Sequence, residues 1–251
     1  MGGAVVFDLD GTLVHNQAFR YAYMRLPERL GLRIDPRAFE EVFLETYYSL
    51  VRSGRLKEAF DWDNVARIAL RRFGASYEED AFLDLLVNGI RRGLVIVARG
   101  ALEVLRELKK SGLVLGVLTN GYSKYQIPVL EATGIISLID VVATNDLLEE
   151  PKPSLAAFRS LGSLIGCDVA DMIYVGDHPY FDIYGAVVAG VGRIFWITKQ
   201  WRPGTYRVGD LSTYIAKYTL DRYGVHISLD KYRNKSVRII DSLQRVLGLV
   251  C

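Results

Sequence analysis

The stretch Val5-Val6-Phe7-Asp8-Leu9-Asp10-Gly11-Thr12-Leu13 places two carboxylates two positions apart behind an apolar run. Such a run is typical of a buried strand in a parallel sheet, where ligands bind beyond the carboxyl ends of the strands. Asp8 and Asp10 would point the same way. Because like charges repel, a divalent cation or a catalytic proton would stabilise the pair. The alternative for this stretch alone is two solvated acids in an Asp-Gly turn.

Three later stretches also carry polar side chains beside predicted strands or helices. They are Thr119-Asn120-Gly121, Lys152-Pro153 and Gly176-Asp177-His178-Pro179-Tyr180-Phe181-Asp182. Each has a structural reading as well. Lys152 can be a solvated lysine that precedes a helix beginning at Pro153. Asp177 can cap a helix, and Asp182 can be an acid in the first turn that interacts favourably with the helix dipole. If the sheet is parallel, however, all four stretches meet at one edge.

The predicted elements supply such a sheet. From Arg99 onward, helical and strand patterns alternate with short connections. Strands are predicted at about 113–118, 139–143, 172–175 and, as the last, 193–197; helices are predicted from Ala101 to before Gly112, at about 123–133, from Lys152-Pro153 to about Ile165, and after Asp182. This alternation predicts an α/β fold with a Rossmann-like, doubly wound parallel sheet.

Between the first strand and this region, the chain shows helix signals and no convincing strand. Helices are predicted at about 17–30, 36–53, 61–74 and 78–92, with Asp35-Pro36 as a helix start and Gly54, Gly74 and Gly93 at helix ends. We therefore expect residues 15–97 to form an inserted all-helical cap, and residues 1–14 with 98–251 to form the core. The aromatic residues Tyr21, Tyr47, Tyr48 and Trp62 suit the core of the cap better than a substrate pocket.

The tail is harder to interpret. The segment 205–235 is rich in tyrosine, which either forms a binding surface or, more commonly, covers an apolar face. The spacing of Val237, Ile240, Leu243 and Leu247 predicts a helix that packs on the core.

Composition excludes several classes of protein. The 251 residues are 50% hydrophobic and 24% charged, which is typical of a globular chain, and the net charge of +2 provides no cationic field for nucleic acid or anionic lipid. No apolar run has transmembrane length, and the N-terminus leads directly into a strand, so we expect no signal peptide. Cys167 and Cys251 lack the spacing of a zinc or disulfide framework, which favours the cytoplasm.

The four polar stretches, in this order and on these elements, resemble the motifs of the haloacid dehalogenase superfamily. The resemblance covers roughly residues 1–14 and 99–198, and the helical insertion looks like the C1-type cap of that family. It implies a phosphatase that hydrolyses a small phosphomonoester through an aspartyl-phosphate, with no nucleic-acid or membrane partner.

The resemblance also assigns roles to residues. Asp8 is expected to be the nucleophile and Asp10 the general acid and base. Asp8, the backbone carbonyl of Asp10 and Asp177 are expected to hold Mg²⁺, with Asp182 as a possible additional ligand, direct or through water. Thr119, Asn120 and Lys152 are expected to bind the phosphoryl oxygens. Whether His15 or His178 contacts substrate stays open, as does the oligomeric state.

Three alternatives accompany this hypothesis. A 2-haloacid dehalogenase shares the attacking carboxylate but typically lacks an aspartate two positions later, so Asp10 with Asp177 argues against it. A phosphomutase of the beta-phosphoglucomutase kind shares both catalytic aspartates, and differs because no free phosphate appears. A non-catalytic protein on the same fold would have lost motif residues, and this chain has lost none.

Overall fold

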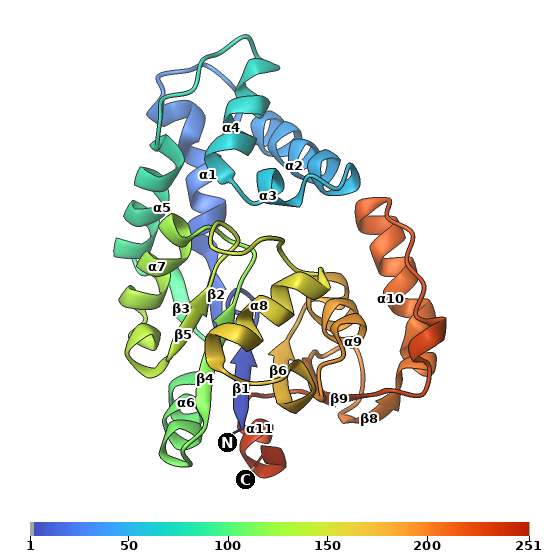
Figure 1. The fold of residues 1–251 in the computed structure, drawn as a ribbon. Helices are drawn as coiled ribbons and strands as arrows, with labels where there is room; N and C mark the ends of the chain where they lie inside the picture. Colours follow the sequence, from blue (N-terminus) through green and yellow to red (C-terminus); the bar gives the residue numbers. More distant parts are fainter. Residues whose placement is uncertain (1–2, 251) are drawn as a thin grey trace.

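A seven-stranded sheet forms the centre of the larger part of the molecule (Figure 1). The computed structural model describes residues 3–250, so Cys251 lies outside the described residues. Strand order is β5-β4-β1-β6-β7-β9-β8, and all neighbours are parallel except the antiparallel pair β8 and β9. The strands are β1 Ala4–Phe7, β4 Val114–Leu118, β5 Val141–Ala143, β6 Met172–Gly176, β7 Arg193–Ile197, β8 Gly204–Arg207 and β9 Ser236–Ile240. The predicted α/β fold with a mainly parallel sheet is confirmed.

The central strand β1 aligns its neighbours at one edge. All four of its residues are fully buried. Phe7 is level with Val117 of β4 and with Val175 of β6. The residues that follow the three strands therefore emerge together, which is the arrangement needed to assemble polar groups from distant parts of the chain.

Helices cover both faces of the sheet, as in a doubly wound fold. One face packs against α8 Leu155–Ile165, α9 Gly185–Ala189 and α10 Val208–Tyr223, and the other against α6 Ala101–Lys110, α7 Ser123–Ala132 and α11 Gln244–Val250. Val6 faces the first of these two cores, whereas Val5 and Phe7 face the second, because successive side chains alternate along a strand.

Five helices form the smaller part at the top of Figure 1: α1 Gln17–Arg29, α2 Pro36–Arg52, α3 Leu56–Ala59, α4 Trp62–Arg71 and α5 Ala81–Arg91. Asp35 caps α2 by accepting from the backbone N–H groups of Arg37 and Ala38, with Pro36 at the first helical position. Aromatic residues such as Phe39, Phe43 and Phe82 form a separate core between these helices. We refer to this part as the cap.

Two expectations about strands are wrong. The cap segment does contain strands: β2 Val14–Asn16 and β3 Val95–Val97 pair antiparallel where the chain leaves and re-enters the core. Three-residue strands produce too little alternation to be read from sequence. The strand at 193–197 is not the last, because β8 and β9 extend the sheet beyond it.

The tail prediction is half wrong for a related reason. Val237 and Ile240 belong to strand β9, and only the segment from Gln244 onward is helical. A short apolar run suits either element, and here pairing with β7 and β8 decides. Within residues 3–250, no helix is long and apolar enough to span a membrane.

Candidate active site

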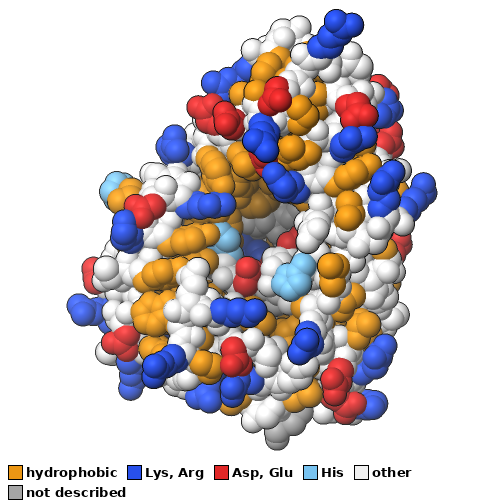
Figure 2. Space-filling model, turned by 180° about the vertical axis from the view of Figure 1, so that it is seen from behind, with side chains coloured by type: hydrophobic (Ala, Val, Ile, Leu, Met, Phe, Trp, Pro, Cys, Tyr) orange, Lys and Arg blue, Asp and Glu red, His pale blue; other side chains and the backbone are white. Residues whose placement is uncertain are grey.

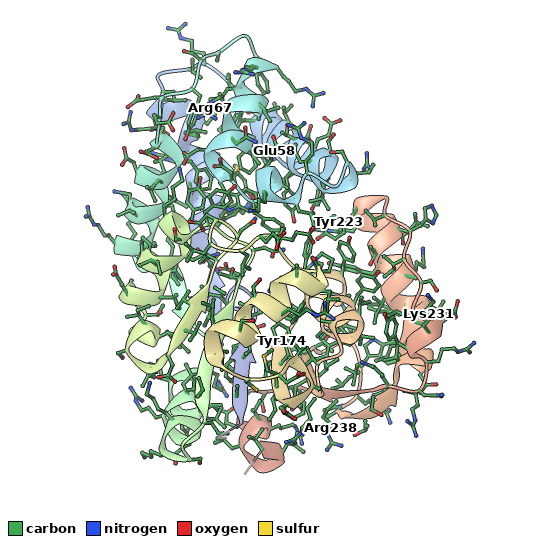
Figure 3. All side chains as sticks on the ribbon, viewed as in Figure 1. Glu58, Arg67, Tyr174, Tyr223, Lys231 and Arg238 are labelled. Atoms are coloured by element: carbon green, nitrogen blue, oxygen red, sulfur yellow. The ribbon has the colours of Figure 1, made fainter. Side chains whose placement is uncertain are left out.

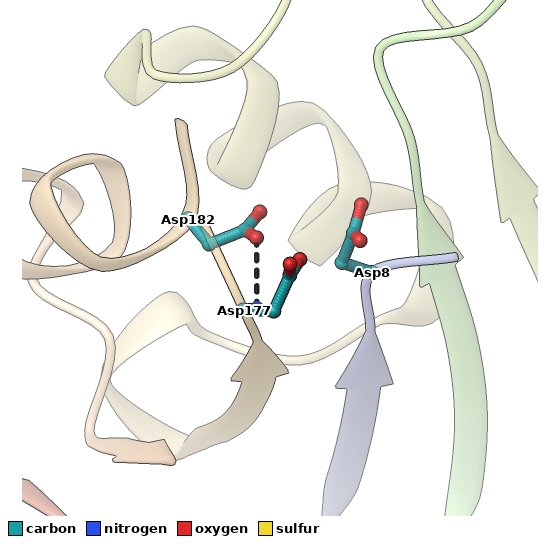
Figure 4. A group of neighbouring side chains, drawn as sticks. All are labelled: Asp8, Asp177 and Asp182. Carbon is teal, nitrogen blue, oxygen red and sulfur yellow. Dashed lines mark hydrogen bonds between the residues drawn. The ribbon is translucent and has the colours of Figure 1, made fainter. Parts of the chain in front are cut away.

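Three carboxylates meet at the edge of the sheet (Figure 4). Asp8 follows β1, Asp177 follows β6, and Asp182 lies in the π-helical turn Pro179–Tyr184. Carboxylate oxygens of the three lie within 4.8 Å of one another. The backbone must come close to allow this: Gly11 has a φ of +92°, and a Cβ there would lie 2.4 Å from an Asp177 carboxylate oxygen.

Lys152 supplies the positive charge that this cluster requires. Its side chain is 2% exposed, and its Nζ donates to Asp8 Oδ1 and to Asp182 Oδ1, each at 2.7 Å. It also donates to the Tyr174 hydroxyl at 3.1 Å. Burial by itself lowers the pKa of Lys152, but the attraction of Asp182 and Asp8 outweighs it and raises the pKa, which favours the charged form of the side chain.

Both oxygens of Asp182 already have partners. Oδ1 accepts from Lys152 and from the Tyr174 hydroxyl at 2.7 Å, and Oδ2 accepts from the backbone N–H groups of Asp177 at 3.1 Å and His178 at 2.9 Å. Burial raises the pKa of this carboxyl, but Lys152 and these hydrogen bonds outweigh burial and lower it. Asp182 therefore holds Lys152 and the turn after β6 in place.

The remaining carboxylates favour a bound cation. Burial raises the pKa of Asp8 well above its ordinary value against the opposing effect of Lys152, and burial together with the charge of Asp182 raises the pKa of Asp177 to about 7. One lysine cannot neutralise Asp8, Asp177 and Asp182 together. The donor set consists of oxygen atoms only, which suits a hard cation such as Mg²⁺.

Asp10 has a different set of neighbours. Its Oδ2 accepts from Gln126 Nε2 at 2.8 Å, while its Oδ1 is buried and has no hydrogen-bond partner among the described residues. Burial raises the pKa of Asp10, and interactions with the side chains of Gln126 and Asn16 oppose this. Gln126 Nε2 also lies 3.3 Å from Thr119 Oγ1, which accepts from the Gly121 N–H at 3.2 Å. Because these bonds use the Thr119 oxygen as an acceptor, its proton is free to be donated.

Asn120 acts on Lys152 through the backbone. Its Nδ2 donates to the Lys152 carbonyl at 2.9 Å, and its Oδ1 accepts from the Lys152 N–H at 2.8 Å. The side-chain amide is therefore occupied in positioning Lys152. The backbone of Asn120 and Gly121 stays available to contact a ligand.

His178 connects the site to α10. Its Nδ1 accepts from the N–H groups of Tyr180 and Phe181, so a neutral ring carries its proton on Nε2, which lies 2.8 Å from the Tyr223 hydroxyl. Burial lowers the pKa of His178 to about 4, which keeps the ring neutral. Tyr223 lies where α10 reaches the cap, as Figure 3 shows. His178 is thus a structural bridge.

A cavity of about 580 Å³ lies between the site and the cap. All the predicted site residues line it: Asp8, Asp10, Thr119, Asn120, Lys152, Asp177 and Asp182. His15 and His178 line it too. The opposite wall comes from the cap and α10, and Figure 2 shows the hollow in the face seen from behind, with hydrophobic side chains around it.

Sequence reasoning missed several contributors. Gln126 and Tyr174 lie inside predicted elements and gave no motif signal. Tyr218, Arg222 and Tyr223 line the cavity from α10, within the tyrosine-rich segment whose role the sequence left open. The burial of its polar side chain is the one signal that could have identified Gln126 as a site residue, and burial cannot be read from a single sequence.

Comparison with known proteins shows the family of this chain. Residues 5–196 match the family model of haloacid dehalogenase-like hydrolases. The phosphoglycolate phosphatase of Rhodospirillum rubrum is 32% identical over 200 residues, which cover 76% of this chain and 78% of that protein. The glyceraldehyde 3-phosphate phosphatase of Methanothermobacter thermautotrophicus is 28% identical over 196 residues, covering 76% and 84%.

Among solved structures, an HAD phosphatase from Thermococcus onnurineus superposes with a TM-score of 0.66 at 23% identity, covering 100% of this chain and 98% of that one. At this identity the likeness establishes the fold alone. The sequence relatives named above are phosphatases, the branch that the motifs resemble. The match over most of its length and the strand-edge carboxylates place the chain in one family: it belongs to the haloacid dehalogenase-like hydrolases.

Proposed function

We propose that this enzyme is a magnesium-dependent phosphatase that hydrolyses a small phosphomonoester through an aspartyl-phosphate on Asp8. One observation carries the proposal. A buried lysine contacts the carboxylate after β1 in the same cavity as a second aspartate and an oxygen-only cation site. This combination suits the transfer of an anionic phosphoryl group, where positioned charges do most of the work. Phosphatases among the sequence relatives support the same reaction class.

In the first step, an Asp8 oxygen attacks phosphorus as the bond from phosphorus to the leaving oxygen breaks. Asp10 gives its proton to that leaving oxygen, and its raised pKa suits an acid that must hold a proton before the step. In the second step, Asp10 accepts a proton from water, which attacks phosphorus and releases Asp8 and inorganic phosphate. The unpartnered Asp10 Oδ1 is the oxygen that can perform both transfers.

The other residues hold the phosphoryl group. Thr119 donates its free hydroxyl proton, the backbone of the Asn120 turn adds donors, and Lys152 places its charge beside Asp8. The carboxylates of Asp8 and Asp177 and the backbone carbonyl of Asp10 would hold Mg²⁺, with Asp182 reaching it through water because its own oxygens are occupied. When bound, the cation supplies charge neutralisation for the phosphoryl oxygens.

The proposal is tested by measuring phosphate release from a panel of phosphomonoesters, each with magnesium and with a chelator. We expect release that requires magnesium. Halide release from a 2-haloacid in chelator, without phosphate release from any ester, would contradict it and favour a dehalogenase. Migration of the phosphate within a sugar phosphate without its release would favour a phosphomutase.

The boundaries between core and cap, expected near residues 15 and 97, stay a prediction. The cytoplasmic location stays a prediction as well.

A further inference from the structure

The cap lines the part of the cavity that faces the catalytic residues. The beginning of the cap segment lines it with His15, Asn16, Gln17 and Phe19. Helices α2, α4 and α5 and the loop between α3 and α4 contribute six further residues: Leu44, Tyr47, Tyr48, Phe60, Trp62 and Leu86. All are apolar or aromatic. These six residues carry no carboxylate, amide or basic group, and their polar side-chain groups are the hydroxyls of Tyr47 and Tyr48 and the indole N–H of Trp62. We call this set the aromatic wall.

The aromatic wall is a continuous surface of rings. The Tyr47 ring centroid lies 5.2 Å from that of Tyr48, 5.6 Å from that of Phe60 and 5.4 Å from that of Trp62. These four residues are half-buried, so part of each ring is left open in the cavity. By contrast, the rings of Phe39, Phe43 and Phe82 in the cap core are fully buried.

Helix α10 closes the cavity with more rings. Tyr218 and Tyr223 line it, and Tyr223 packs on Tyr48 at 5.9 Å between centroids. The Arg222 guanidinium lies over the Tyr48 ring at 5.2 Å. The three α10 residues, Tyr218, Arg222 and Tyr223, lie outside residues 5–196, the part of the chain that matches the family model. The aromatic lining is therefore partly built from a segment outside that match.

Such a lining selects against hydrophilic leaving groups. A sugar or hydroxy acid would lose water from its hydroxyl groups and find few partners on this wall, and an unpaired buried polar group is costly. A flat ring would instead pack on the rings and gain from apolar burial. The cavity volume of about 580 Å³ lies within the range of sites that enclose ligands larger than a two- or three-carbon phosphate.

We infer that the substrate is a phosphomonoester whose leaving group carries an aromatic ring, bound between the aromatic wall and α10. This rests on the proposed phosphatase function and specifies its substrate class. It differs from the substrates printed in the names of the two relatives described above, phosphoglycolate and glyceraldehyde 3-phosphate.

The test compares benzyl phosphate with ethyl phosphate and glycerol phosphate in the presence of magnesium. All three release an alkyl alcohol, so their intrinsic reactivities are similar and binding decides the outcome. We expect kcat/KM for benzyl phosphate to exceed that for ethyl phosphate by about tenfold or more. Equal rates, or a preference for glycerol phosphate, would overturn the substrate class while leaving the phosphatase function in place. Failure of all three and of the wider panel would overturn the phosphatase function itself.

Two variants test whether the aromatic wall causes the preference for benzyl phosphate. Tyr47→Ala removes the central ring of the wall, and Leu44→Gln puts an amide on the same wall at similar volume. Both should reduce the ratio of kcat/KM for benzyl phosphate to that for ethyl phosphate several-fold. Tyr21→Ala is the matched control, because this cap tyrosine bonds to Asn88 and is absent from the cavity lining. An unchanged preference in a folded Leu44→Gln protein would contradict the role of the wall.

Discussion

Lys152 shows how a single buried residue sets the charges of the site. It contacts the proposed nucleophile and Asp182 at the same distance, and Asn120 fixes its backbone. Removal of the lysine would leave two buried carboxylates without a counter-charge, which is among the costliest changes in a protein interior. The same lysine that balances these carboxylates is therefore placed to meet the phosphoryl group.

Replacement of the proposed nucleophile gives the sharpest prediction at this scale. Asp8→Asn keeps the shape of the side chain but removes its nucleophilic oxygen charge, so we expect kcat to fall by about 10³-fold or more. The melting temperature should change little, since one of several mutually repelling carboxylates is lost. The measurement is phosphate release beside a thermal melt. Asp171→Asn, at an exposed acid, is the control, and near wild-type turnover by Asp8→Asn would refute the assignment.

Gln126 gives a second prediction because it fixes Asp10 by a hydrogen bond of 2.8 Å. Gln126→Leu removes that bond at similar volume, so Asp10 is less well oriented for proton transfer. We expect kcat to fall by about tenfold to a hundredfold with KM nearly unchanged. Steady-state kinetics measure kcat and KM separately. Gln200→Leu, at an exposed position, is the control variant. A rise in KM at constant kcat would show that Gln126 binds substrate instead.

At the scale of elements, Asp140 joins β5 to its neighbours. Its carboxylate accepts from the Leu115 N–H of β4 at 2.9 Å and from Lys109 of α6 at 2.8 Å. The hydrogen bond from the Leu115 backbone, then that from Lys109, lowers the pKa of Asp140. A carboxyl with a lowered folded-state pKa stabilises the fold above its unfolded-state pKa, and this contribution is lost as pH falls through the folded-state value.

We therefore expect Asp140→Asn to reduce the free energy of unfolding near neutral pH by ~0.5–1 kcal/mol, a modest value because the pair is partly exposed. The difference between variant and wild type should shrink below the folded-state pKa of the carboxyl. Urea unfolding of both proteins at neutral and acidic pH measures it. A difference that stays constant with pH would show that the charge of Asp140 contributes nothing.

How well the sequence predicts the structure differs from one element to another. Strands β1, β4 and β6 were predictable because each is a buried apolar run that ends in a polar motif, and the same motifs identified Asp8, Thr119 and Asp177. Strand β9 was not, since Val237 and Ile240 suit a helix as well as a strand until β7 and β8 pair with them. The roles of Gln126 and Tyr223 could not be predicted from the sequence, for another reason. Their roles depend on contacts across more than 40 positions of the chain, which no local pattern records.

At the scale of the whole molecule, α10 connects the two parts. It packs on the core sheet through Leu211 and Ile215, and its far end meets the cap (Figure 1). There the Tyr223 carbonyl accepts from Arg52 of α2 at 3.3 Å. The cap is also held at α7, where Asp63 bonds to Tyr125 and Lys124. Besides the strand pair β2 and β3, the cap therefore contacts the core at α7 and at α10, and any opening of the cavity must loosen these contacts.

The last prediction concerns the cation and the stability of the whole chain. Asp8, Asp177 and Asp182 lie within 4.8 Å of one another with one lysine to balance them, so the apo fold bears a repulsion that a bound divalent cation would relieve. A ligand that binds only the folded state at 100 times its Kd adds about 2.7 kcal/mol of stability. We expect magnesium to raise the melting temperature relative to chelator. The same scan on Asp177→Asn should show a higher melting temperature without magnesium and little further rise with it. An equal magnesium effect in both proteins would mean that the cation binds elsewhere.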